Sequence, residues 1–153
     1  AKSWLEKTRP TKILNERFIQ TLHHRMFKNV WKWAGQYRQS DKNIGGSWYL
    51  VPMSLKDLCD DAAVWIELRE DPPDLIAARI HHRLVSIHPF PNGNGRHSRE
   101  MANLLLKNIL QHPEFTWGRL NLSEAGSIRK QYIESLHAAD GGNYEPLLAF
   151  VRT

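Results

Sequence analysis

The sequence of 153 residues contains one cysteine, Cys59, and no long apolar run. A single cysteine excludes an internal disulfide bond, and its place on an apolar helical stripe predicts a buried structural thiol in a reducing compartment. No apolar stretch approaches the roughly 20 residues that a membrane-spanning helix needs. Residues 2–12 are polar and charged, which is unlike a secretory signal peptide. These absences predict a cytoplasmic protein with no membrane partner.

Internal repeats, low-complexity segments and linkers are also absent. The length therefore predicts a single domain over residues 1–153 with one core, in which residues 1–13 are interpreted as the remnant of a longer N-terminal region. The eight histidines include no pair at H-x-x-x-H or HExxH spacing. This absence argues against a zinc site at His81 and His82.

The charge balance is positive, with 21 lysines and arginines against 16 aspartates and glutamates and a formal net charge of +5. Such a balance suits an anionic partner, either nucleic acid or the phosphates of a nucleotide. The basic residues are spread along the chain rather than gathered into a tract, which disfavours nucleic acid. A generally solvated basic surface is the plain alternative.

Hydrophobic spacing predicts a mainly α-helical domain. A short final helix is expected near residues 144–151. One helix should end at His88, because Pro89 disfavours helical geometry at the residue before it. Helix starts are expected at or near five polar residues, namely Asn15, Ser54, Asp74, Ser98 and Ser123.

Residues 36–52 contain few helix-forming residues. Gly45 and Gly46 separate two short extended stretches, 36–44 and 47–51, and this pattern predicts a β-hairpin. It is the one sheet-like element expected. The predicted fold is therefore a mainly α domain with one β-hairpin.

The most informative stretch is residues 88–99, with the sequence HPFPNGNGRHSR. Its two asparagines and two glycines tolerate positive φ and lead into a helix, whose free backbone N–H groups and dipole attract anions. Arg96 and Arg99 lie one turn apart on one face of that helix and can grip a polyphosphate. On the other side of the turn, His88 has an ordinary pKa near neutrality and can accept a proton.

Taken alone, a Pro-Asn-Gly-Asn-Gly sequence is usually a surface turn. Here it is combined with a histidine, with two arginines at i,i+3 spacing, and with Phe90, which is expected to root the loop in the core. The combination favours an anion-binding site with an adjacent base over a simple turn.

The same stretch is similar to the signature of the Fic family, H-x-F-x-(D/E)-G-N-G-R-x-x-R. It matches every fixed position except Asn92, where most members carry an acid. Residues 30–38 and 42–45 resemble the segment that leads into the Fic flap. The resemblance covers most of residues 18–150 and is strongest to the small bacterial members called mobile mystery protein B.

This resemblance implies a protein adenylyltransferase, an enzyme that transfers AMP from ATP to a Ser, Thr or Tyr hydroxyl of a target protein. It implies that His88 is the catalytic base that deprotonates the acceptor. The residues that correspond to the phosphate-binding positions of the family are Gly93, Asn94, Gly95, Arg96 and Arg99.

Within that set, the resemblance implies that Arg96 binds the β-phosphate region and that Arg99 binds the γ-phosphate. It also implies Mg²⁺, with Asn92 at the ligand position. The flap that aligns the target segment would include Asn43, Ile44, Gly45 and Gly46.

Two alternatives stay open. Some relatives transfer phosphate, UMP or phosphocholine, or remove AMP, and the motif does not separate these donors because each presents phosphates. A non-catalytic nucleotide-binding or partner-binding module is favoured by Asn92 alone. The inhibitory motif of many Fic proteins, (S/T)-x-x-x-E-(G/N), has no match here. An inhibitor would lie on another chain or before residue 1, or would be lacking.

Overall fold

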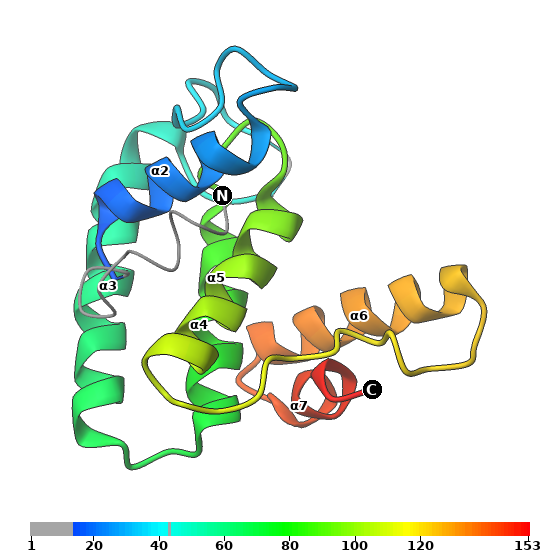
Figure 1. The fold of residues 1–153 in the computed structure, drawn as a ribbon. Coiled ribbons are helices and arrows are strands. Elements are labelled where there is room, and N and C mark those ends of the chain that lie inside the picture. The colour runs from blue at the N-terminus through cyan, green and yellow to red at the C-terminus, as the bar shows by residue number, and fades with distance from the viewer. Residues whose placement is uncertain (1–13, 43) are drawn as a thin grey trace.

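The computed structural model describes residues 14–42 and 44–153, and their regular elements are helices (Figure 1). No helix among these residues combines the length and apolar character needed to cross a membrane. In chain order the elements are α2 (Glu16–Phe27), the 3₁₀ helix η2 (Trp48–Leu50), α3 (Val51–Leu68), α4 (Pro73–Ile87), α5 (Asn94–Asn108), α6 (Ala125–Asp140) and α7 (Glu145–Val151).

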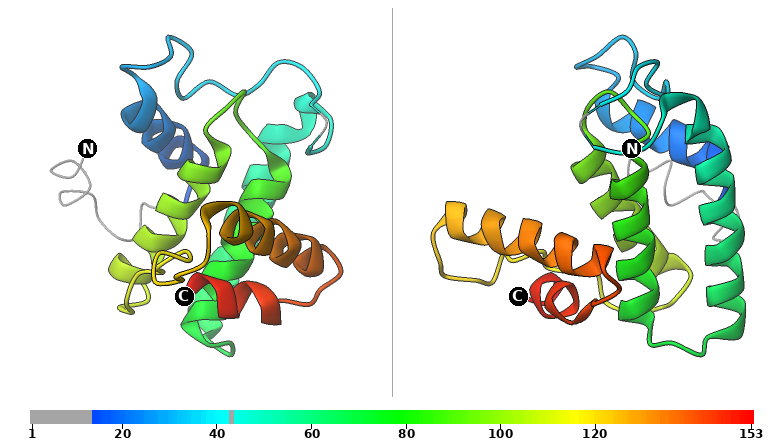
Figure 2. Two further views of the ribbon diagram at one scale, coloured as in Figure 1. Left: turned by 90° about the vertical axis from the view of Figure 1, so that its right-hand side faces the viewer. Right: turned by 180° about the vertical axis from the view of Figure 1, so that it is seen from behind.

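The helices form two groups (Figure 1, Figure 2). In the first, α3 and α4 lie side by side and antiparallel, α5 returns along α4, and α2 packs against α3 and α5. In the second, α6 and α7 pack against each other and project to one side, with α7 in contact with α4. Apolar side chains at helical spacing fill the space between the long helices, among them Leu55, Leu58, Ile80, Leu84, Met101 and Leu105.

Cys59 belongs to this core and is 8% exposed. Burial raises the pKa of its thiol to about 11, so the group stays protonated and unreactive at neutral pH. The prediction of a buried structural thiol is confirmed.

Helix starts follow local chemistry, but not always at the predicted residue. Asn15 caps α2 as expected, because its side-chain Oδ1 accepts the backbone N–H of Phe18 at 2.8 Å. The predicted starts at Ser54 and Asp74 are wrong by a few residues, since α3 begins at Val51 and α4 at Pro73. Both helices carry a proline in their first turn, Pro52 in α3 and Pro73 in α4. Proline is tolerated there because the N–H that it lacks would have no partner within the helix, so each helix can begin before the predicted residue. Likewise, α6 begins at Ala125 rather than directly after the predicted cap at 123.

The start of α5 matters most for function. The helix begins at Asn94, four residues before the predicted start at Ser98, and its first backbone bond runs from the His97 N–H to the Gly93 carbonyl at 3.0 Å. The backbone N–H groups of the first turn therefore come from within the glycine-rich motif itself, where an anion can reach them.

The predicted β-hairpin is wrong, because no residue of the described chain is in a strand and residues 48–50 form η2. The physical reason is Arg38, a buried residue whose side chain is 1% exposed. Its guanidinium donates to the carbonyls of His88 and Gly46, each at 2.6 Å, and of Ser40 at 3.0 Å.

The backbone N–H of Arg38 also bonds outside its own segment, to the Pro89 carbonyl at 2.9 Å. The N–H of Trp48 bonds the Asp41 carboxylate at 2.8 Å. The backbone groups of this segment therefore bond to the Arg38 guanidinium, to the Asp41 carboxylate and to the α4–α5 turn. None of these partners is a facing strand. Of the residues predicted for the flap, Asn43 lies outside the described residues.

Gly45 is pressed against the end of α4 and has φ +89°. An added Cβ would lie 3.0 Å from the Ile87 carbonyl oxygen and 3.1 Å from the His88 Cβ. The neighbouring Gly46 has nothing within 4 Å of the same position. The glycine at 45 is thus required by a close approach and by its backbone angle.

We expect Gly45→Ala to lower the free energy of unfolding by about 1–3 kcal/mol, through strain at positive φ and displacement of the end of α4. Gly46→Ala is the matched control and should stay within about 0.5 kcal/mol of the wild type. Urea denaturation of the three proteins measures both values. Equal unfolding free energies for the two variants would contradict the packing of Gly45.

Candidate active site

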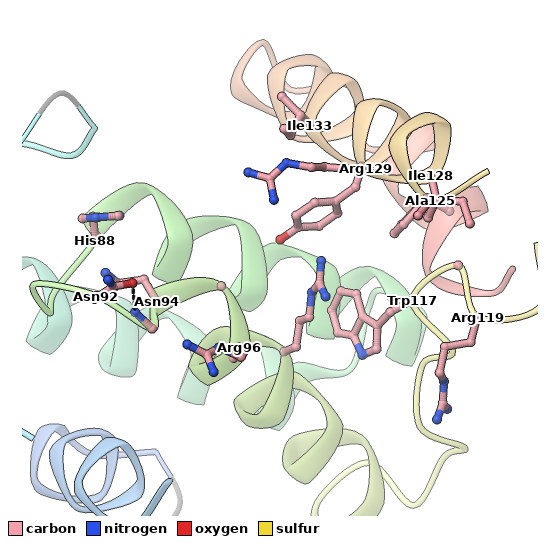
Figure 3. A pocket seen from close by; sticks show the side chains of 16 residues that line it. His88, Asn92, Asn94, Arg96, Trp117, Arg119, Ala125, Ile128, Arg129 and Ile133 are labelled. Atoms are coloured by element: carbon pink, nitrogen blue, oxygen red, sulfur yellow. Dashed lines mark hydrogen bonds between the residues drawn. The ribbon is translucent and has the colours of Figure 1, made fainter. Parts of the chain in front are cut away.

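A cavity of about 700 Å³ opens between the α4–α5 turn and helix α6 (Figure 3). Residues 117–119, several side chains of α6 and Phe150 of α7 complete its wall. The predicted flap positions Ile44, Gly45 and Gly46 are not among the lining residues. The structure does bring together every predicted base, phosphate-binding and metal position: His88, Asn92, Gly93, Asn94, Gly95, Arg96 and Arg99.

The turn between α4 and α5 is stabilised on its buried side by Asn94 and Phe90. The Asn94 side chain accepts the Phe90 N–H at 3.0 Å and donates to the Phe90 carbonyl at 2.7 Å. Phe90 itself is completely buried, which confirms that it roots the loop in the core. Gly93 has φ +78°, and a Cβ there would lie 2.8 Å from the ring of Phe27. Side-chain bonds and packing thus fix the turn, and its backbone remains at the cavity.

A second support comes from His23 on α2, whose Nε2 lies 2.9 Å from the Asn92 carbonyl oxygen. Its Nδ1 accepts the Gly35 N–H at 2.9 Å, so the ring proton must be on Nε2, which donates to Asn92. Burial lowers the pKa of His23 and keeps the ring neutral. The ring also stacks on Phe90 with centroids 3.8 Å apart. No local pattern in the sequence points to a role for His23 at the site, because its partner Asn92 lies 69 residues away in the chain.

His88 follows the last residue of α4 and adopts the left-handed conformation, with φ +53°. Its N–H closes the helix by bonding the Leu84 carbonyl at 3.2 Å. The predicted end of the helix at His88 is therefore confirmed. Burial first, then the nearby charges of Arg38 and Lys42, lowers the pKa of His88 below the ordinary 6.5. The imidazole is neutral at pH 7 and can accept a proton there.

Arg96 and Arg99 are held by aromatic rings. The Arg96 guanidinium lies 4.8 Å from the ring centre of Phe27. The Arg99 guanidinium lies 4.5 Å from the ring centre of Tyr132 and 5.7 Å from that of Trp117. The Nε of Arg99 is buried and makes no hydrogen bond to any described residue. Within the described residues, neither side chain pairs with a carboxylate that would compete for a bound anion.

Two further arginines, Arg119 and Arg129, line the same cavity, and sequence analysis missed both. In Figure 3, Arg129 extends from α6 toward the side where His88 and Asn94 lie. The lining residues within the described chain include four arginines and no aspartate or glutamate. Uncompensated positive charge of this density favours a polyanionic ligand. No spacing in the sequence points to Arg119 and Arg129, because the packing of the second helix group brings them to the cavity.

Asn92 offers the cavity an amide oxygen and no charge. Its Oδ1 accepts the Gly93 N–H at 2.8 Å, which leaves the oxygen one further lone pair. Within the described residues, no group of three or more His, Cys, Asp or Glu side chains is placed to hold a metal ion. An ion here would find one protein oxygen, and phosphate oxygens and water would have to supply its other ligands.

Residues 13–106 match the family model described as the Fic/DOC family. Similar proteins include a protein adenylyltransferase Fic of Aedes aegypti, 30% identical over 121 residues, and one of Nematostella vectensis, 32% identical over 122 residues. The aligned region is 77% of this chain in both cases, and 23% and 26% of the relatives. The chain therefore spans about a quarter of their length.

Solved structures share the fold. Fic-1 of Caenorhabditis elegans superposes with a TM-score of 0.72 and 28% identity, over 90% of this chain and 39% of that one. BepC of Bartonella tribocorum, solved with bound AMPPNP, superposes with a TM-score of 0.71 over 95% of this chain and 76% of that one. Its identity of 19% supports likeness of fold alone.

Proposed function

The chain belongs to the Fic/DOC family, and on that premise we propose that it transfers AMP from ATP to a Ser, Thr or Tyr hydroxyl of a target protein. The observation that carries this proposal is a cavity in which a neutral histidine lies with a turn at a helix N-terminus and four arginines, and with no aspartate or glutamate among the described lining residues. The relatives named protein adenylyltransferase support the choice of reaction.

In the proposed reaction His88 accepts the proton of the target hydroxyl. The hydroxyl oxygen forms a bond to the α-phosphorus, the bond from that phosphorus to the bridging oxygen of the β-phosphate breaks, and pyrophosphate leaves. Charge therefore grows on the phosphate oxygens during the step. The N–H groups at the start of α5, with Arg96 and Arg99, stabilise that charge, which is the main source of catalysis in phosphoryl-type transfer.

For the individual phosphates, we assign the turn Gly93, Asn94 and Gly95 to the α- and β-phosphates. Arg96 binds the β-phosphate region, and Arg99 binds the γ-phosphate. An inhibitory glutamate of the kind that pairs with the second arginine in many Fic proteins would reach Arg99 from a partner chain or from a segment before residue 1, or the protein lacks one.

We propose that Mg²⁺ acts with the nucleotide and that Asn92 is the position that meets it. The ion would neutralise phosphate charge when bound. The amide oxygen of Asn92 fits a weak contact, because Mg²⁺ keeps several waters and accepts phosphate oxygens as its main ligands. The same amide is the one observation that favours a second candidate function, a nucleotide-binding module without transfer.

We expect His88→Ala to reduce transfer by about 10²–10⁴-fold and to leave the fold intact, because a general base is removed. Labelled ATP incubated with host lysate measures the incorporation, and the labelled protein is then identified by mass. His137→Ala, at an exposed position on α6, is the control and should keep the wild-type rate. If His88→Ala incorporated label at the wild-type rate, His88 would not be the general base.

The same base predicts the pH dependence of transfer. Activity should rise with pH as His88 loses its proton, and should level off before pH 7, because its pKa lies below 6.5. A rise centred above pH 7 would contradict a neutral His88.

Arg99→Ala should weaken ATP binding by roughly 10–100-fold, since it loses a charge-assisted contact to the γ-phosphate. ADP lacks that phosphate, so its affinity should change far less. Calorimetric titration with both nucleotides measures the difference. Lys107→Ala, two turns further along α5 and exposed, is the control for charge alone. Equal losses for ATP and ADP would refute the role of Arg99.

Asn92→Asp should lower the Mg²⁺ concentration needed for half-maximal transfer and should preserve or raise the rate, because a carboxylate meets the ion with a full charge. Two unit charges about 4 Å apart gain roughly 4 kcal/mol at an effective dielectric of 20. Desolvation offsets much of that gain, so a net effect of a few kcal/mol is the upper bound. Titrations of activity against Mg²⁺ test this. An unchanged metal dependence would mean that Asn92 does not meet the ion.

A further inference from the structure

Arg99 is held by a pair of buried side chains that the motif does not contain. Its guanidinium lies 4.5 Å from the ring centre of Tyr132 on α6. The Tyr132 hydroxyl is bonded in turn to Nε2 of His81 on α4, at 2.8 Å. His81 is completely buried and Tyr132 is 9% exposed. The three residues thus connect α4, α5 and α6 at the cavity, where Arg99 and Tyr132 are lining residues and His81 is not.

Both supporting groups are uncharged at neutral pH. Burial lowers the pKa of His81 to about 3, so the imidazole is neutral. Burial also raises the pKa of Tyr132, against the opposing charge of Arg99 and a hydrogen bond between the two side chains, so the phenol keeps its proton. The pair therefore fixes the plane of the Tyr132 ring by a hydrogen bond and adds no negative charge near Arg99.

An arginine that binds an anion must be fixed in place by groups that do not compete with the anion for its N–H donors. A carboxylate partner would fix the guanidinium but would compete with phosphate for its donors. Aromatic faces attract the cation through their π-electrons, and a neutral phenol competes with phosphate for the donors far less than a carboxylate would. The Arg99 Nε is buried and has no hydrogen-bond partner in the described chain, so no carboxylate there occupies this donor.

We propose that His81 and Tyr132 are positioning residues that hold the Arg99 guanidinium, before any ligand arrives, in the orientation that receives the terminal phosphate of the nucleotide. This inference rests on the proposed function, in which Arg99 binds that phosphate. Ordering a long side chain on binding costs about 0.5–1.5 kcal/mol in general, and a pre-ordered arginine avoids that cost.

The chain offers a matched control on the next residue of α4. Tyr144 places its hydroxyl 3.4 Å from Nδ1 of His82, so this second tyrosine–histidine pair also joins α4 to the C-terminal helices. Neither Tyr144 nor His82 lines the cavity. Tyr132→Phe and Tyr144→Phe each remove one hydroxyl from such a pair, and only the first pair contacts Arg99.

The experiment is calorimetric titration of the whole chain with ATP and with ADP. Tyr132→Phe should weaken ATP binding by about 3–10-fold, the size expected for one lost hydrogen bond, and ADP binding by less than twofold. Tyr144→Phe should change either affinity by less than twofold. In an Arg99→Ala background, Tyr132→Phe should cause no further loss, because the residue that it positions is already absent.

The outcomes separate the inference from the proposed function. Equal behaviour of Tyr132→Phe and Tyr144→Phe, or an undiminished effect of Tyr132→Phe without Arg99, would overturn the inference alone. If Arg99→Ala itself does not favour ADP over ATP relative to the wild type, the proposed role of Arg99 fails and the inference fails with it.

A measurement on the wild type covers the case in which Tyr132→Phe does not fold. The Arg99 Nε–H signal in a nitrogen-15 NMR spectrum, assigned by its loss in Arg99→Lys, should exchange slowly with solvent before any nucleotide is added. The exposed Arg129 provides the fast-exchange reference. Fast exchange at Arg99 would overturn the inference.

Discussion

The double hydrogen bond between the Asn94 side chain and the backbone of Phe90 is the constraint on which the site depends. It closes the turn between α4 and α5 while Phe90 fills the core beneath. This closure sets where α5 begins, and so which N–H groups face the cavity. It also places His88 on one side of those groups and the arginines on the other. An amide suits this task, because it can both donate and accept hydrogen bonds and carries no charge that a bound phosphate would attract or repel.

The site is assembled almost wholly from neutral supports around positive groups. His23 holds the Asn92 carbonyl as an uncharged imidazole, and aromatic rings hold Arg96 and Arg99. The carboxylates that pair with arginines elsewhere, such as Asp74 with Arg152, lie away from the cavity. The positive potential is therefore concentrated where nothing in the described chain neutralises it. A ligand with several negative charges meets that potential without first breaking an ion pair.

Features that depend on neighbours in sequence could be predicted. The capping of α2 by Asn15, the end of α4 at His88, and the common location of His88, Asn92, Arg96 and Arg99 all follow from contiguous stretches. Features that depend on distant partners could not. The hairpin failed because Arg38 reaches the carbonyl of His88, 50 residues away. The supports at His23 and Tyr132 were missed for the same reason, since each is paired across more than 50 residues.

The two walls of the cavity come from different stretches of the chain. The family model ends at residue 106, after the base, the turn and both motif arginines. The facing wall, from Trp117 through α6, follows that boundary. Under the proposed function, the first stretch carries the transfer reaction and the second contacts whatever part of the donor extends beyond the phosphates. Because Tyr132 on α6 also contacts Arg99, exchanging the last third of the chain between relatives would change the facing wall and the support of this arginine together.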